Sequence, residues 1–178
     1  MGANVRAREE TLWTPLHLAA QTGGDAGAEI ARSLLANGAD VDARTNRKTT
    51  SLHLAAQSGD NPFIEILLAA NADIEASTSS ELTPICSAAV NGHIDTIDLL
   101  WEHGAIVDIR DEDGWNLLHL ACHMTDNVEL IEKLISIGVS MDGLTNRRQT
   151  PLCVAIQAEH FEVFEALLKH GAKTDLED

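Results

Sequence analysis

The sequence predicts an all-α fold, a solenoid of stacked helix pairs, and two observations lead to this prediction. A seven-residue string recurs five times with a period of about 33 residues. The copies are TPLHLAA from Thr14, TSLHLAA from Thr50, TPICSAA from Thr83, NLLHLAC from Asn116 and TPLCVAI from Thr150. A second string follows each copy at a fixed offset, as in NGADVDA from Asn37 and ANADIEA from Ala70. Such a period is typical of repeated supersecondary units.

The first element of each unit is predicted to be a short helix. Thr14 can cap a helix whose first position is Pro15, because the N–H that proline lacks would have no partner at that position. Leu16 and the small Ala19 and Ala20 follow, which gives the helix a narrow back. The four later copies of the string repeat this pattern with substitutions.

The second element is a helix that begins after a turn at Gly23. The apolar periodicity of EIARSLL predicts this helix, and Gly38 can supply the left-handed residue that closes it. The first copy of the period carries three extra residues in GGDAGAE, and the fourth copy carries one near MTDNVE. We expect both insertions to lie in the turn between the two helices. Neither helix is long enough to be stable alone, so each pair must pack on the next.

Five copies in register with the second string make the chain resemble the ankyrin-repeat family over nearly its whole length. The resemblance implies β-hairpin loops between units and a concave groove. We expect one domain, 1–178. It would contain the tail of a preceding repeat at 2–13 and repeats at 14–49, 50–82, 83–115, 116–149 and 150–178. Neither end carries a separate capping repeat, so we expect a fragment of a longer array. The alternative is a complete small protein whose end repeats tolerate exposure or self-associate.

Composition restricts the classes of partner and compartment. A net charge of -16 disfavours nonspecific binding to nucleic acid or to anionic membranes. No apolar run approaches the ~18 residues of a membrane span, so membrane insertion is not expected. Cys86, Cys122 and Cys153 form no CxxC pair, and the stacked repeats would hold them beyond disulfide reach. These features indicate a reducing intracellular compartment, cytoplasmic or nuclear.

The aligned histidines and cysteines could suggest a metal site. The spacing between stacked helix pairs argues against such a site. His17, His53 and His119 align with Cys86 and Cys153 at the fourth position of the string. Stacked units lie about 10 Å apart, whereas zinc ligands lie about 2 Å from the metal. In the ankyrin family this histidine bonds backbone between adjacent loops. The sequence also has no catalytic motif, so we expect no enzymatic activity, no cofactor and no metal.

Charge and tryptophan suggest where a partner binds. The predicted helices are strongly acidic, which serves solubility or favours encounter with a basic partner. Trp101 aligns with leucines of the second helix and is expected in the core. Trp13 and Trp115 precede the capping position, where they either anchor a partner or pack onto the next loop.

The predicted function is that of a non-catalytic scaffold that binds another protein through loop tips and inner helices. The resemblance points to these partner-binding residues: Trp13, Arg47, Lys48, Gln57, Leu82, Trp115, His123, Met124, Arg147 and Arg148. The alternative is a repeat segment of a larger enzyme, ubiquitin-ligase adaptor, channel or immune receptor whose activity lies elsewhere.

Overall fold

A computed structural model describes residues 11–174 of the chain as two compact units. Unit 1 comprises the residues up to Ala88 together with Asp95–Ala105, and unit 2 comprises Ala89–Ile94 together with the residues from Ile106 onward. Most of the predicted tail, 2–13, lies outside the described residues. The helices are α1 (Pro15–Thr22), α2 (Gly24–Ala36), α3 (Ser51–Ser58), α4 (Asn61–Ala69), α5 (Pro84–Val90), α6 (Ile94–Glu102), α7 (Leu117–Met124), α8 (Val128–Ser136), α9 (Pro151–Gln157) and α10 (Phe161–Lys169).

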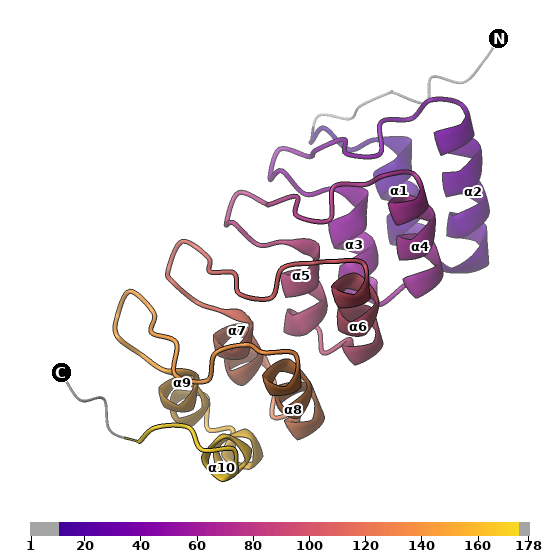
Figure 1. Ribbon diagram of the computed structural model, residues 1–178. Helices are drawn as coiled ribbons and strands as arrows, with labels where there is room; N and C mark the ends of the chain where they lie inside the picture. The colour runs from indigo at the N-terminus through magenta and orange to yellow at the C-terminus, as the bar shows by residue number, and fades with distance from the viewer. Residues whose placement is uncertain (1–10, 175–178) are drawn as a thin grey trace. The chain divides into compact units, whose positions relative to one another are not determined.

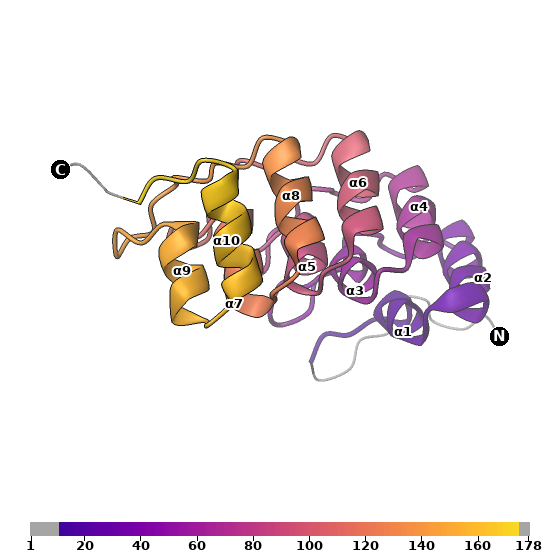
Figure 2. The same cartoon turned by 90° about the horizontal axis from the view of Figure 1, so that it is seen from below.

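The all-α class is confirmed, because residues 11–174 contain helices and turns but no strand. Within unit 1, α1 packs beside α3 and α2 beside α4, so first helices form one row and second helices another (Figure 1). Within unit 2, α7 packs beside α9 and α8 beside α10 (Figure 2). The predicted division into five repeats is a finer expectation, and each predicted repeat contains one of the helix pairs.

Aliphatic side chains of the second helices form the core of each unit. Leu67 and Leu100 in unit 1, and Leu134 and Leu167 in unit 2, are fully buried as predicted. Leu34 in α2 was expected to match them but is only half-buried. The reason is that α2 packs against α4 on one side, whereas no described helix covers its other side.

The prediction that Trp101 lies in the core is wrong, because 44% of the residue is exposed. It follows the buried Leu100 by one residue in α6, and one residue turns a helix by about a quarter of a turn. That rotation carries the indole out of the core. Leu168, at the equivalent position of α10, is likewise exposed.

The insertion of the first repeat lengthens a helix instead of a turn, which corrects the prediction. Helix α2 has 13 residues where α4 has 9, and a single residue, Gly23, separates α1 from α2. The added turn brings Gly27 under the carbonyl of Ala19, where a Cβ would lie 2.6 Å from that oxygen. Glycine is therefore required for the longer helix. In repeat four the segment 125–127 joins α7 to α8 and is as long as 91–93 and 158–160 in the third and fifth repeats, so the position of the extra residue stays a prediction.

The aligned histidines join consecutive loops through backbone bonds, as the resemblance implied. In α3, the backbone N–H of Thr50 donates to His53 Nδ1 at 3.2 Å, and His53 Nε2 donates to the Leu82 carbonyl at 3.0 Å. A carbonyl only accepts, so Nε2 carries the proton and Nδ1 is the acceptor. His17 and His119 make the same bridge to the carbonyls of Thr49 and Gln149, at 3.1 and 2.9 Å.

Candidate partner-binding surface

The loops that follow the second helices are hairpins built from turns. In the first of them, the N–H of Thr45 donates to the Thr49 carbonyl at 3.0 Å, and Thr45 Oγ1 accepts from the Thr49 N–H at 3.1 Å. The chain reverses through Lys48, which has a φ of 58°. This tight closure leaves the side chains of Arg47 and Lys48 exposed at the tip. Asp111, Trp115, Thr145 and Gln149 close two further loops in the same way.

Within each unit, consecutive loops are joined backbone to backbone. In unit 1 the N–H of Ser79 donates to the Arg47 carbonyl at 2.9 Å. In unit 2 the N–H of Asn146 donates to the Asp113 carbonyl at 2.8 Å, and Asn146 Nδ2 donates to the Glu112 carbonyl at 2.8 Å. The loop tips of one unit therefore form a supported edge on which side chains are presented at regular intervals.

In unit 2 the structure brings several of the predicted binding residues together around Trp115. Its half-buried ring lies 6.0 Å from the His119 ring and 5.4 Å from the His123 ring, the latter edge-on. A cleft of ≈ 120 Å³ lies beside it, lined by Asp113, Trp115, Arg147 and Gln149. An aromatic wall, a guanidinium and a carboxylate thus meet in one small recess.

Three other predicted residues of unit 2 are placed as follows. His123 is exposed at the last turn of α7, and Met124, which ends this helix, is 53% exposed. Arg148 is exposed at its loop tip with a φ of 59°. None of the three lines the cleft, although the His123 ring touches the Trp115 ring that does.

The predicted residues of unit 1 are more dispersed. Trp13 is half-buried against the His17 ring, with ring centroids 5.7 Å apart. Leu82 is half-buried before α5, while Gln57 is exposed near the end of α3. Both Trp13 and Trp115 thus rest on the histidine of the repeat that follows them, while part of each indole stays accessible. This arrangement leaves room for both roles that the sequence suggested.

Sequence reasoning did not select Gln149 as a site residue. It lines the cleft, and its Nε2 donates to Gln157 Oε1 at 2.9 Å. A signal was present, because Gln149 occupies the position that Trp13 and Trp115 occupy in their repeats. A polar residue there drew less attention than an aromatic one.

The titratable groups inside the repeats are structural. Burial lowers the pKa of His53 and of His119, and the carbonyl bonds of both rings oppose that shift only in part. Burial raises the pKa of the Cys122 thiol to about 12, so it is protonated at neutral pH. Within residues 11–174 no three His, Cys, Asp or Glu side chains are placed to hold a metal ion. No described helix has the length and apolarity to cross a membrane.

Comparison with known proteins agrees with this geometry. The family model described as ankyrin repeats (3 copies) matches residues 1–78, 52–142 and 107–178. A fowlpox virus ankyrin repeat protein is 29% identical over 84 residues, which is 45% of this chain and 25% of the relative. An Arabidopsis thaliana ADP-ribosylation factor GTPase-activating protein is 35% identical over 65 residues, or 36% of this chain and 8% of the relative.

A Saccharomyces cerevisiae 26S proteasome regulatory subunit is 29% identical over 79 residues, covering 43% of this chain and 34% of the relative. The chain therefore spans about a third or less of the length of these curated relatives. The family match, in contrast, extends over the whole sequence. Together with the helix pairs and the histidine bridges, that match shows that the chain belongs to the ankyrin-repeat family.

Proposed function

We propose that this chain is a non-catalytic protein-binding module whose principal contact surface is the row of loop tips and first helices. The cleft at Trp115 carries this proposal, because an accessible indole lies there beside the guanidinium of Arg147. Tryptophan and arginine dominate binding energy at protein interfaces. Ankyrin repeats in general mediate protein–protein interaction, which supports the same class of function.

The roles of the individual residues follow from their exposure. Trp115 and Met124 serve as apolar anchors in unit 2, and His123 contacts the partner from the edge of the indole. Trp13 and Leu82 serve as anchors in unit 1, with Gln57 beside them. The tip residues Arg47, Lys48, Arg147 and Arg148 form the charged rim, where a substitution changes association rate and salt dependence more than affinity.

We propose that the second helices speed the encounter with a partner by their charge and do not themselves bind the partner. Glu129 and Glu132 of α8 and Glu162 of α10 are exposed, and the chain as a whole carries a net charge of -16. A field of this sign raises the encounter rate with a basic partner. We place this function inside the cell, where the thiols of Cys86, Cys122 and Cys153 would stay reduced.

A second proposal is that the chain acts as the repeat segment of a larger protein. The matched segments make up only 8% of the Arabidopsis relative and 34% of the yeast relative. The name of the first describes a GTPase-activating protein and that of the second a proteasome subunit. Under this proposal the module positions an activity that is encoded elsewhere.

The test is an affinity capture of partners from source cells with matched variants. Trp115→Ala is compared with Trp101→Ala, which removes another partly exposed tryptophan away from the loops. We expect Trp115→Ala to weaken binding of the captured partner by about 2 kcal/mol or more, while Trp101→Ala leaves the partner bound. Circular dichroism of each variant verifies folding.

A charge-reversed variant, Glu129→Lys plus Glu132→Lys, completes the experiment. We expect it to slow association and leave the equilibrium affinity nearly unchanged. If the partner were lost only in this variant and kept in Trp115→Ala, the binding surface would lie on the second helices and the proposal would be wrong.

A further inference from the structure

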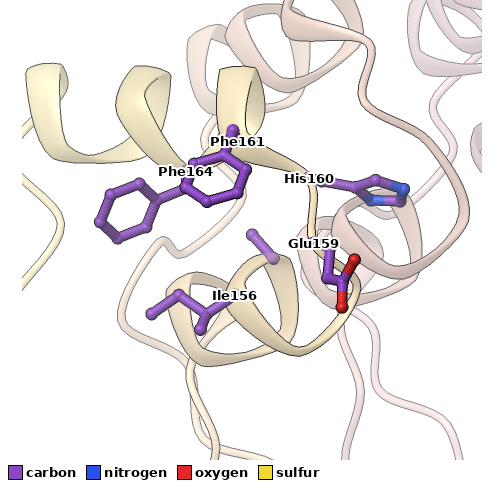
Figure 3. Close-up of a pocket in the computed structure, with 6 residues that line it drawn as sticks. Ile156, Glu159, His160, Phe161 and Phe164 are labelled. Atoms are coloured by element: carbon purple, nitrogen blue, oxygen red, sulfur yellow. The ribbon is translucent and has the colours of Figure 1, made fainter.

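Unit 2 contains an apolar pocket at its last helix pair, and this pocket shares no lining residue with the Trp115 cleft. It has a volume of ≈ 240 Å³ and is lined by Ala155, Ile156, Glu159, His160, Phe161 and Phe164. Figure 3 shows Ile156 and the two phenyl rings facing one region, with the imidazole of His160 turned away from the rings. The pocket walls are thus apolar, with the Glu159 side chain at their edge.

Comparison among the repeats shows that Ile156 departs from the pattern. The residues at its position in the four other repeats are small and at most 1% exposed: Ala20, Ala56, Ala89 and Cys122. Ile156 is larger and 56% exposed. Small side chains at this position allow the close approach of helices, so a further repeat of the same design would meet excess volume here.

The two phenylalanines extend this departure. Phe164 replaces the isoleucine of three other repeats, where Ile64, Ile97 and Ile131 are fully buried. Phe161, at the start of α10, is 73% exposed. Large apolar side chains gathered on a surface mark an interaction site. The enlarged walls create a recess that the regular repeat face lacks.

Glu159 supplies a second and independent observation. It has a φ of 60° at the position where Gly23, Gly59 and Gly92 have φ values of 65°, 71° and 76°. A left-handed conformation is unfavourable for a residue with a side chain and accumulates at functional sites. This carboxylate lines the pocket in place of a glycine, so it adds charge at a cost in stability.

Two hydrogen bonds to the preceding repeat in unit 2 hold the start of α10, and with it the pocket, in place. His160 Nδ1 donates to the Cys122 carbonyl at 2.9 Å, which holds the imidazole away from the phenyl rings. The N–H of Val163 donates to Asp126 Oδ1 at 2.9 Å and satisfies the first turn of α10. The recess is therefore preformed.

We propose that this pocket is a second binding site, which takes one large apolar side chain of a different protein flanked by lysine or arginine. The apolar walls accept the side chain, and Glu159 accepts the flanking charge. Glu162 and Glu165 are exposed on the same helix and extend the negative rim. Complementary charge thus selects a basic segment.

A second copy of the chain fits this site poorly. Its described basic tips, Arg47–Lys48 and Arg147–Arg148, are flanked by Asn46, Thr49, Asn146 and Gln149, and these flanking residues are polar. They offer no large apolar side chain next to the charge. These loop tips therefore do not match the site, and we assign the occupant to a different protein.

The probe is a fluorescent synthetic peptide, GSKKFKKSG, titrated against the whole chain by anisotropy. The matched control is GSKKSKKSG, which has the same charge but no apolar anchor. We expect the phenylalanine peptide to bind about tenfold or more tightly than the serine peptide. Equal affinity of the two peptides would show attraction by charge alone and would overturn the proposal.

Three variants locate the binding. Glu159→Gly restores the residue found in other repeats, so we expect a higher melting temperature together with weaker peptide binding. Ile156→Ala plus Phe161→Ser removes two apolar walls, and we expect it to abolish the advantage of the phenylalanine peptide. Ile30→Ala, at another exposed apolar residue, should bind the peptide like the native chain.

Two results would contradict the assignment. Unchanged discrimination between the peptides in Ile156→Ala plus Phe161→Ser would place the site elsewhere. Sedimentation showing a dimer of the native chain that this double variant dissociates would identify a second copy as the occupant. In either case the loop-tip surface is tested separately by Trp115→Ala.

Discussion

Helices α3 in unit 1 and α7 in unit 2 begin with the same backbone design but different side chains. At α3, Thr50 Oγ1 lies 2.8 Å from His53 Nδ1, and a hydroxyl can donate to that nitrogen. The pocket beneath is closed by Ala76, which is buried. Every polar atom of the cap therefore has a compatible partner.

At α7 the cap is Asn116, and its chemistry differs. Asn116 Oδ1 lies 2.7 Å from His119 Nδ1, while Asn116 Nδ2 donates to the Ser140 carbonyl at 2.8 Å. With Nε2 donating to the Gln149 carbonyl, Nδ1 is an acceptor that faces another acceptor. Each of these two atoms accepts a backbone N–H at 3.1 Å, Nδ1 from Asn116 and Oδ1 from His119.

The space beneath the two caps differs in a matching way. Gly143 in unit 2 takes the position of Ala76, and a Cβ on it would lie 2.9 Å from Asn116 Nδ2. The larger cap and the smaller loop residue compensate each other. Repeats in one chain thus teach that a departure from the shared pattern must be interpreted together with its spatial neighbour.

The largest effect should be common to both units, because their cores are equivalent. Leu67→Ala in unit 1 and Leu134→Ala in unit 2 each remove a fully buried side chain. We expect each to lower the free energy of unfolding by about 2 to 5 kcal/mol in urea titrations. Gln57→Ala, at an exposed position, should change it by less than about 0.5 kcal/mol. Similar losses in all three variants would refute the assigned helix register.

The second prediction separates the two caps. Gly143→Ala should lower the free energy of unfolding by about 1 to 3 kcal/mol, because the added methyl meets Asn116 Nδ2. In an Asn116→Thr background the same change should be nearly neutral, since the native pair then becomes the Thr–Ala pair of unit 1. Urea titration of the four chains gives the coupling energy. Additive losses would contradict the compensation.

The third prediction concerns the residue after the cap. Ser51 is buried, and its hydroxyl has no hydrogen-bond partner within the described residues. The preceding Thr50 has a ψ of 168°, which is the extended conformation that proline requires before it. Ser51→Pro should therefore raise the free energy of unfolding by about 0.4 to 1 kcal/mol.

The matched change in unit 2 gives the opposite expectation. Leu117→Pro, at the equivalent position, replaces a fully buried leucine and should destabilise the chain. Thermal melts of the two variants provide the comparison. A lower melting temperature for Ser51→Pro would show that the first turn of α3 does not tolerate the ring.

The smallest expected effect is the acid sensitivity of the two caps. Burial holds the pKa of His53 and of His119 below 6.5, so the unfolded chain binds their protons first. Their contribution to stability is therefore complete above about pH 6.5 and falls as the pH drops toward the folded-state pKa values. Urea midpoints at pH 7.5 and 5.5 measure this loss.

Matched variants isolate the histidines from the many carboxylates. His53→Gln plus His119→Gln should be less stable than the native chain at pH 7.5 but should lose less between pH 7.5 and 5.5. His103→Gln, at an exposed residue, should retain the native pH dependence. An unchanged pH dependence in the double variant would show that other groups govern acid stability.

Features that recur in several repeats could be predicted from the sequence. Thr50 and Pro151 marked the starts of helices, the leucines equivalent to Leu67 marked the core, and the aligned histidines were correctly assigned to backbone bonds. Each of these positions has several aligned copies, so one assignment could be tested against the others.

Features that occur once were missed. The longer α2 depends on the close approach of Gly27 to the Ala19 carbonyl, and no sequence pattern predicts this approach. The exposure of Trp101 depends on a rotation of one residue around α6. The pocket at Ile156 and Phe161 depends on a side-chain volume that exceeds the local pattern. Such departures need coordinates, because they concern space rather than periodicity.

The histidine bridges have a consequence for how the chain folds during synthesis. Each joins residues only 29 to 32 positions apart, from His53 to Leu82, from His119 to Gln149 and from His17 to Thr49. A newly made helix pair therefore waits only for the loop that ends its own repeat before its histidine bridge can form. Translation proceeds at about 5 to 20 residues per second, so each wait lasts only seconds. The nascent polypeptide can acquire native order progressively, with little apolar surface left open to chaperones or aggregation at any moment.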